Sequence, residues 1–325
     1  MNLSTAARME RNLALEFVRV TEAAAIAAAH WLGKGDKKAA DKAAVDAMRT
    51  RFNVVDFEGE VVIGEGDKDE APMLYIGERI GTGKGARIDI AVDPLEGTEL
   101  VAKGRPNAIS VLAAGAKGSL LKAPGSYMNQ IAVGAAAQGA VDITAPLKKN
   151  VKNVAAALGK SVQDVTVVLL ERDRHKPIID ELRKIGCRIY LIEHGTVAAG
   201  LATAIEGSGI DMMVGIGGAP EGVITAAGLK CLGGDFQGIL KPHEQKYIEQ
   251  AQAMGISDLN HVFMIDELAK GEELQFVATG VSSGPFLHGV LFGKRNMTTH
   301  SIVMRKKSGT VRFLTTIHKH EGERR

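Results

Sequence analysis

The sequence is poor in several features that would indicate particular classes of protein. It has only two cysteines, Cys187 and Cys231, in 325 residues, and neither stands in a CxxC pair. Neither a disulfide framework nor a zinc cluster is therefore indicated, and we expect a reducing, cytoplasmic environment. Charge of one sign is not in excess, because 40 basic residues stand against 38 acidic ones. Since this balance provides no global field that would attract nucleic acid, we expect no nucleic-acid partner.

Long apolar runs and aromatic residues are also scarce. No apolar segment approaches the length that crosses a bilayer, and residues 1–11 carry charges and lack the apolar core of a signal peptide. We therefore expect neither a membrane partner nor secretion. Aromatic residues make up 4% of a chain that is 45% hydrophobic, so the core must rely on Ala, Val, Ile and Leu. The length suffices for about two domains.

The apolar periodicity predicts an α/β fold built from packed layers, with ligands at strand ends. Helices are expected at residues 11–32 and 36–51, and strands at 60–63, 73–76, 88–92, 108–113 and 128–133. Further along, strands at 165–170, 188–192, 212–216 and 236–240 alternate with helices at 175–185, 197–205, 224–232 and 243–254, before late strands at 274–279, 301–304 and 311–317. We place a boundary at 145–150, which divides the chain into an N-terminal α+β domain (1–150) and a C-terminal α/β domain (151–325).

The most informative stretch is Asp-Pro-Leu-Glu-Gly-Thr at residues 93–98. A buried strand precedes it, and Pro94 is expected to end that strand because proline has no N–H to donate. Asp93 and Glu96 then project from a sheet edge, which suits the ligation of a divalent cation by hard oxygen atoms. The glycine and threonine that follow would present backbone N–H groups to an anion. Carboxylates for a metal beside donors for a phosphate predict a metal-dependent phosphatase. The alternative is an ordinary strand-turn-helix with an Asp cap.

One acid on a predicted helix also requires an explanation. Asp41 falls on the apolar line of Val45, Met48 and Phe52. A carboxylate on an apolar face costs several kcal/mol unless it is paired or binds a metal. Asp41 is therefore a candidate ligand, and the alternative is a partly solvated Asp in the first turn of the helix, where the helix dipole favours it.

Two glutamates follow strands in glycine-rich segments. Glu65 stands between Gly64 and Gly66, and its acidic neighbours at 67, 69 and 70 are interpreted as a solvated turn. Glu221 follows Gly-Gly-Ala-Pro (217–220), whose glycines could line a phosphate or sugar site. Simple loop geometry is the alternative for the latter. Four acids that each end a buried element together favour a metal site.

Basic residues follow the strand predicted at 165–170. Arg172, Arg174 and His175 lie where a substrate phosphate could accept charge-assisted hydrogen bonds. Asp173, between the two arginines, supports the alternative of a solvated loop of mixed charge. The stretch Gly-Thr-Gly-Lys-Gly at 81–85 lacks the spacing of a nucleotide-binding P-loop and is interpreted as a surface turn.

Six motifs in one order resemble those of the class II (GlpX-type) fructose-1,6-bisphosphatases. They are Arg19-Val-Thr-Glu-Ala, Gly35-Asp36-Lys37, Ile63-Gly-Glu65-Gly, Glu70-Ala-Pro72-Met73-Leu-Tyr-Ile-Gly77, Asp93-Pro-Leu-Glu96-Gly-Thr98 and Gly217-Gly-Ala-Pro-Glu221-Gly. The resemblance runs from residue 11 to the strand Thr299-His-Ser-Ile-Val-Met-Arg305. It implies the fold of the lithium-sensitive sugar and inositol phosphatases, a five-layer αβαβα sandwich, and Mn²⁺- or Mg²⁺-dependent removal of the 1-phosphate.

The resemblance also implies roles for individual residues. The implied metal ligands are Asp41, Glu65, Asp93, Glu96 and Glu221, and the implied catalytic groups are Thr98, beside the attacking oxygen, and Glu65. The implied substrate contacts are Glu96, Gly97, Thr98, Tyr127, Arg172, Asp173, Arg174, His194, Gly195, Thr196 and Gly218. On this basis the N-terminal domain binds the metal and the C-terminal domain supplies substrate loops. We expect a sugar bisphosphate as the small-molecule partner, and a homodimer or homotetramer.

The sequence departs from the family pattern in three motifs, and the altered positions include those that face the sugar. His194-Gly195-Thr196 replaces Asp-Gly-Asp, Arg172-Asp173-Arg174 replaces Lys/Arg-Pro-Arg, and Ala40-Asp41-Lys42 replaces Ala-Asp-Gly. The metal and phosphoryl positions are intact. Two alternatives therefore stand beside a fructose-1,6-bisphosphatase: a phosphatase for another sugar or polyol phosphate, such as sedoheptulose-1,7-bisphosphate, and a non-catalytic sugar-phosphate sensor.

Overall fold

The computed structural model describes residues 5–65 and 74–319, with side chains from residue 13 onward. Contacts divide the chain into two compact units: Met1–Leu120 with Glu272–Arg325, and Leu121–Gly271. This division differs from the boundary predicted at 145–150. Residues 127–133 pair with strands of the second unit, and the late strands return to pair with the first. Within the described ranges, no helix combines the length and apolarity needed to cross a membrane.

The first unit is built on a mixed eight-stranded sheet. The order is β12-β13-β11-β4-β3-β1-β2, and β14 pairs with β13. Its strands are β1 (Glu58–Ile63), β2 (Arg79–Ile80), β3 (Arg87–Glu96), β4 (Ile109–Ala116), β11 (Gln275–Gly280), β12 (Leu291–Phe292), β13 (Asn296–Arg305) and β14 (Thr310–Lys319).

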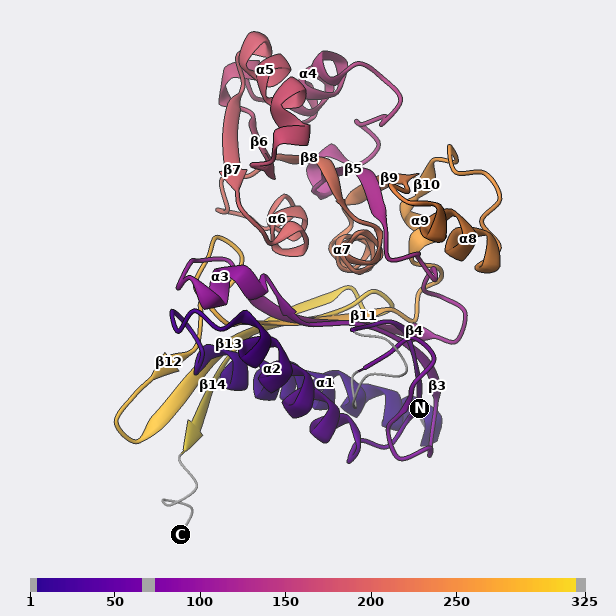
Figure 1. Ribbon diagram of the computed structural model, residues 1–325, viewed down its shortest axis with the longest axis vertical. Coiled ribbons are helices and arrows are strands. Elements are labelled where there is room, and N and C mark those ends of the chain that lie inside the picture. The colour runs from indigo at the N-terminus through magenta and orange to yellow at the C-terminus, as the bar shows by residue number, and fades with distance from the viewer. Residues whose placement is uncertain (1–4, 66–73, 320–325) are drawn as a thin grey trace. The chain divides into compact units, whose positions relative to one another are not determined.

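Two long helices cover one face of this sheet (Figure 1). They are α1 (Thr5–Ala29) and α2 (Lys37–Phe52), and the short α3 (Thr98–Ala102) follows β3. The rings of Phe17, Phe52 and Phe57 meet in the core, with Phe17 lying edge-on 5.5 Å from Phe57. Small residues of α1, such as Ala24 and Ala28, are fully buried, as the aromatic-poor composition required.

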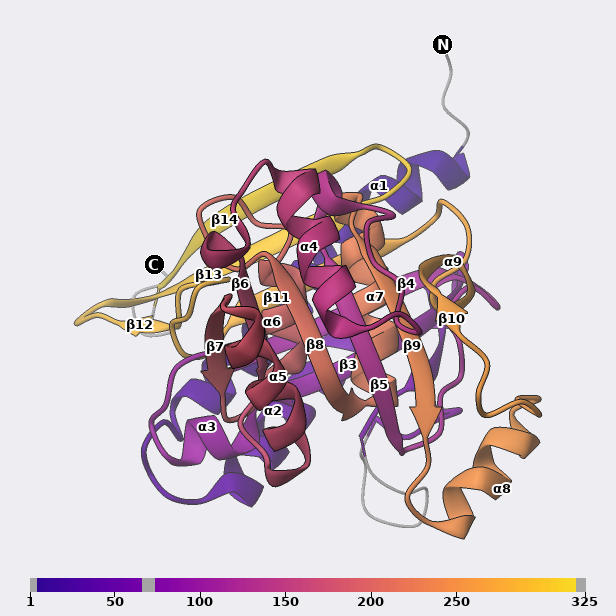
Figure 2. The same cartoon turned by 90° about the horizontal axis from the view of Figure 1, so that it is seen from above.

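The second unit is a layered α/β structure around a six-stranded sheet of order β10-β9-β5-β8-β6-β7. Helices α4 and α5 cover one face and α6 and α7 the other, as Figure 1 and the view from above in Figure 2 show. The strands are β5 (Tyr127–Val133), β6 (Thr166–Leu170), β7 (Arg188–Ile192), β8 (Met212–Gly218), β9 (Asp235–Lys241) and β10 (Phe263–Met264). The helices are α4 (Leu147–Leu158), α5 (Lys176–Ile185), α6 (Thr196–Ala202), α7 (Ala219–Leu232), α8 (Gln245–Ala253) and α9 (Ile265–Leu268). The predicted α/β layered fold is thus confirmed.

Several local predictions were wrong. The strand expected at 73–76 is absent from its described part, 74–76, and a two-residue strand forms at Arg79–Ile80 instead. The expected boundary near 145–150 is the start of α4, with Pro146 as its N-cap residue. Helix α7 begins at Ala219, five residues before the predicted start, because Pro220 in the first turn loses no intrahelical hydrogen bond. The acidic turn predicted at residues 67, 69 and 70 lies outside the described residues.

Candidate metal and substrate site

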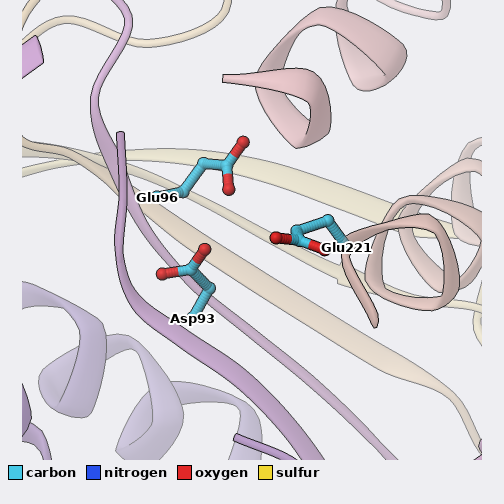
Figure 3. A group of neighbouring side chains, drawn as sticks. All are labelled: Asp93, Glu96 and Glu221. Carbon is cyan, nitrogen blue, oxygen red and sulfur yellow. The ribbon is translucent and has the colours of Figure 1, made fainter. Parts of the chain in front are cut away.

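The carboxylates of Asp93 and Glu96 owe their common direction to an irregularity in β3. Three residues apart on a regular strand, they would point to opposite faces of the sheet. Asp93 pairs with Val111 and Glu96 with Ile109, so β3 carries one more residue than β4 between the two pairs. Such a bulge re-aims side chains, and both carboxylates project to one side with oxygen atoms within 4.8 Å of one another (Figure 3).

The bulge also explains why the prediction about Pro94 was wrong. The strand continues through Pro94 to Glu96. The missing N–H does no harm, because the two residues inside the bulge, Pro94 and Leu95, have no ladder partners on β4. The N–H of Leu95 instead donates to Oδ1 of Asp93 at 3.1 Å, which holds the aspartate side chain over the turn.

The backbone then turns at Gly97 into α3. Gly97 has φ 93°, in the left-handed region, and a Cβ atom there would lie 2.9 Å from the Leu100 side chain. Thr98 is the first residue of α3. In the second unit, Gly195 has nearly the same φ and ψ before Thr196, the first residue of α6. Both predicted Gly-Thr elements are therefore strand-to-helix turns of one geometry.

Glu65 follows a strand that runs beside β3. Strand β1 is parallel to β3, and Ile63 is the register partner of Ala91. Glu65 and Asp93 each follow this matched pair by two residues, so both lie at the same end of the two strands. The N–H of Glu65 donates to the Leu74 carbonyl at 2.9 Å, which fixes the backbone of this segment.

Asp41 lies on α2, which packs against β3 and α3. Its Oδ1 atom is buried and has no hydrogen-bond partner within residues 13–65 and 74–319. Burial raises the pKa of this carboxyl above its ordinary value. The helix-start alternative does not apply, because Asp36 is the N-cap and accepts from the N–H of Ala39. A buried carboxylate oxygen without a partner within the described residues, on a helix that packs against the strand with the two acids, fits a divalent cation.

Glu221 lies in the first turn of α7, in the second unit (Figure 3). Its side chain folds back across Gly218, where a Cβ atom would collide with Oε2 at 1.8 Å. Gly218 therefore provides the space that the Glu221 carboxylate occupies. The carbonyl of Gly218 accepts a hydrogen bond from the Gln130 side chain at 2.8 Å, which anchors the turn to β5.

The predicted substrate residues of the second unit gather at the ends of β5, β6 and β8. The Arg174 guanidinium lies 4.7 Å from the centre of the Tyr127 ring and donates to the Ile216 carbonyl at 2.9 Å. Tyr127 is in turn the register partner of Gly218. The structure thus brings Tyr127, Arg174 and Gly218 together, as a shared ligand would require.

Arg172 reaches the segment that departs from the family pattern. Its guanidinium donates to the Glu193 carbonyl at 2.5 Å and lies 3.1 Å from Nε2 of His194. A guanidinium can only donate, so the facing ring nitrogen of His194 must accept. Asp173 instead points to solvent, where a pair with Lys176 lowers the pKa of its carboxyl. The structure therefore does not bring Asp173 to the other substrate candidates.

The interpretation of His175 as a phosphate donor was wrong. Its side chain is fully buried, and both ring nitrogens are engaged with backbone groups. No signal in the sequence indicates this burial, because the residues on either side of His175 are charged.

Comparison with known proteins gives a consistent result. The model of the family described as bacterial fructose-1,6-bisphosphatase, glpX-encoded, matches residues 11–318. The Escherichia coli (strain K12) fructose-1,6-bisphosphatase 1 class 2 is 45% identical, with 95% of this chain and 96% of the relative covered. The Haemophilus influenzae fructose-1,6-bisphosphatase class 2 is 43% identical, with 95% and 97% covered. Because the match extends over nearly the whole chain, the resemblance predicted from the motifs is confirmed, and the chain belongs to the glpX-encoded bacterial fructose-1,6-bisphosphatase family.

Proposed function

We propose that this protein is a divalent-metal-dependent phosphatase that hydrolyses the 1-phosphate of fructose-1,6-bisphosphate, with fructose 6-phosphate and phosphate as products. The observation that carries the proposal is the bulge at residues 93–96, which turns two carboxylates to one side directly before the Gly97–Thr98 turn. A purely structural turn has no need to bring two like charges together. The choice of fructose-1,6-bisphosphate as the substrate is supported by membership of the family.

Asp41, Glu65, Asp93, Glu96 and Glu221 would hold the metal. All five supply carboxylate oxygen atoms, the ligands that suit Mn²⁺ and Mg²⁺. When bound, such ions neutralise charge on the phosphoryl oxygens and make water a better nucleophile at neutral pH. The first four residues belong to one unit, and we propose that Glu221 joins them from the other.

The remaining roles concern orientation and proton transfer. We propose that the Thr98 hydroxyl orients the attacking water and that Glu65 accepts its proton, since a general base must lie within hydrogen-bond reach of the group that it deprotonates. Gly97 leaves the backbone open for the phosphoryl group to approach. In the second unit, we propose that Arg172 and Arg174 bind the distal phosphate, that Tyr127 and Gly218 contact the sugar, and that His194-Gly195-Thr196 faces the hydroxyl groups.

The test is phosphate release with purified protein and a panel of sugar phosphates. With Mn²⁺ or Mg²⁺ present, fructose-1,6-bisphosphate should release phosphate, and excess EDTA should abolish this release. A preference for sedoheptulose-1,7-bisphosphate would favour the alternative that His194 and Thr196 suggest. Binding of sugar phosphates without release under any metal condition would instead identify a sensor, and full turnover in EDTA would overturn the metal assignment.

We propose further that the protein forms a homo-oligomer and works in the cytoplasm. Strand β14 pairs only with β13 among the described strands and exposes Phe313 and Ile317, and exposed apolar residues on an unpaired edge favour association. Cys187 and Cys231 form no disulfide bond with one another, as expected in a reducing compartment. Light scattering of the purified protein tests for a dimer or tetramer, and a monomer at micromolar concentration would contradict the assembly.

A further inference from the structure

The parallel strands β6 and β8 separate before either of them ends. Their register partners are Val167 with Met212 and Val168 with Met213, while β6 continues to Leu170 and β8 to Gly218. Beyond the second pair, the backbone groups of the two strands no longer bond to one another. Strand ends that diverge in this way create a crevice in an α/β sheet, and ligands bind in such crevices.

The ring of His175 fills the gap between the two strands. Its Nδ1 lies 2.7 Å from the Leu170 carbonyl, and its Nε2 lies 2.7 Å from the Ile216 amide nitrogen. A carbonyl only accepts and an amide N–H only donates, so Nδ1 carries the proton and Nε2 accepts. One neutral imidazole thereby replaces the direct hydrogen bonds of the ladder between β6 and β8.

The residues around His175 favour the neutral form of its imidazole ring. The His175 side chain is fully buried, and burial, reinforced by the charges of Arg174 and Arg172, lowers the pKa of the imidazole. Gly215, with φ 131°, leaves the space for it, because a Cβ atom there would lie 3.1 Å from Nε2. The remaining cavity of about 10 Å³, lined also by Thr196, holds at most one water molecule.

The two backbone groups that His175 joins belong to the segments that carry the substrate candidates. The arginine loop, residues 172–174, directly precedes the histidine, and the carbonyl of Ile216 accepts from Arg174 at 2.9 Å. Ile216 therefore bonds through its N–H to His175 and through its carbonyl to Arg174. From Ile216 the chain continues to Gly218, the register partner of Tyr127.

We propose that His175 is a positioning residue for substrate binding, which fixes the arginine loop against the Ile216–Gly218 turn and so sets the geometry of the sugar-phosphate subsite. The inference rests on the proposed function. His175 touches no substrate itself, since its ring is fully enclosed. Its loss should weaken the binding of the sugar phosphate.

The experiment compares three variants with the wild-type protein. His175→Leu fills the space without either hydrogen bond, and His175→Gln keeps a donor and an acceptor in the nitrogen and the oxygen of its side-chain amide. Asn150→Leu is the matched control, because Asn150 is also buried in the second unit and bridges the N–H and the carbonyl of Asp142 at 2.8 Å each. The measurements are the melting temperature, kcat and KM for fructose-1,6-bisphosphate, and the Kd of fructose 6-phosphate by calorimetry.

For His175→Leu we expect KM and the Kd of fructose 6-phosphate to rise about tenfold, which corresponds to about 1.4 kcal/mol. His175→Gln should recover much of this affinity. Asn150→Leu should lose melting temperature without a change in KM. A merely structural role for His175 predicts that His175→Leu behaves like Asn150→Leu, and that result would overturn the inference.

Should His175→Leu not fold, His175→Asn takes its place, because its shorter amide cannot reach both Leu170 and Ile216. The same rise in KM is expected, and a wild-type KM refutes the positioning role. Failure of the proposed function has a separate signature. In that case the wild-type protein itself neither releases phosphate from fructose-1,6-bisphosphate nor binds fructose 6-phosphate, and the inference falls with it.

Discussion

Removal of the charge at Asp41 should stabilise the metal-free protein while it destroys metal binding. The carboxyl is half-buried on α2, and its Oδ1 atom has no hydrogen-bond partner within the part of the chain that is described. Asp41→Asn keeps the shape of the side chain and removes the charge. Because a neutral unpaired oxygen costs less to bury than a charged one, the metal-free variant should be the more stable protein at pH 7.

The size of the gain follows from the burial. An unsatisfied buried polar group costs about 1–3 kcal/mol and more when charged, and partial exposure places this site near the low end, at about 1 kcal/mol. For a domain of this size, 1 kcal/mol shifts the melting temperature by about 2–4 °C. The folded-state pKa of Asp41 is raised, so the penalty is absent below the ordinary value of 3.8 and develops as pH rises through the folded pKa. The gain should therefore be present at pH 7 and vanish in acid.

At a saturating metal concentration, the wild-type protein should instead have the higher melting temperature of the two. A ligand at 100 times its Kd stabilises the state that binds it by about 2.7 kcal/mol, or about 5–10 °C at the same conversion. The wild-type protein should show this shift with Mn²⁺, and Asp41→Asn should lose most of it. Thermal melts in EDTA and in Mn²⁺ measure both effects.

Asp46→Asn is the control on the same helix. Asp46 is exposed and pairs with Lys42 at 2.9 Å, so its replacement should alter neither the metal-free melting temperature nor the metal-dependent shift by more than about 1 °C, since an exposed pair contributes little. An Asp41→Asn protein that melts lower than wild type in EDTA and keeps the full Mn²⁺ shift would refute the reasoning, because Asp41 would then be a structural acid.

Three further predictions concern the reaction itself. Asp93→Asn and Glu221→Gln should each remove most turnover with little change in fold, whereas normal kcat with a lower melting temperature would identify these acids as caps, which contribute about 1 kcal/mol. Thr98→Ala should lower kcat more than it raises KM, and Thr98→Ser should retain much more activity; an equal loss in both would assign the role to the methyl group. Restoring the family acids with His194→Asp plus Thr196→Asp should change the preference among sugar phosphates in a panel assay, and unchanged kcat/KM for all substrates would show that the present residues are neutral.

The sequence predicted the α/β class and most strands because apolar periodicity depends on local burial. Prediction from the sequence failed where the role of an element depends on other elements that it contacts in the fold. The predicted boundary near 145–150 is the start of α4, since proline at a helix N-terminus and proline in a linker look alike in sequence. The late strands could not be assigned to the first unit from their own residues, because they join its sheet through β11, whose register partners on β4 are more than 150 residues away in the sequence.

Candidate acids could be identified from the sequence, but the way in which they come together could not. A spacing of three residues predicts opposite faces of a strand for Asp93 and Glu96, and only the pairing of β3 with β4 shows the extra residue that turns both to one side. The sequence predicts that the strand ends at Pro94, whereas its missing N–H makes proline suited to the unpaired position inside the bulge. The same residue thus caused the wrong prediction and stabilises the geometry on which the proposed metal site depends.

His175 illustrates the opposite limit. Its residue type suggested a charged group that binds a substrate phosphate, since an unperturbed histidine titrates near neutral pH. Burial between two strands decides otherwise, because a protonated Nε2 would face the Ile216 N–H with no acceptor for its hydrogen. A buried position between two diverging strands cannot be deduced from the residue's neighbours in sequence, which are charged and exposed. The residue types of this segment therefore indicate where a site lies. The separation of β6 from β8 determines that His175 is enclosed between the strands, where it can position Arg174 but cannot itself contact a ligand.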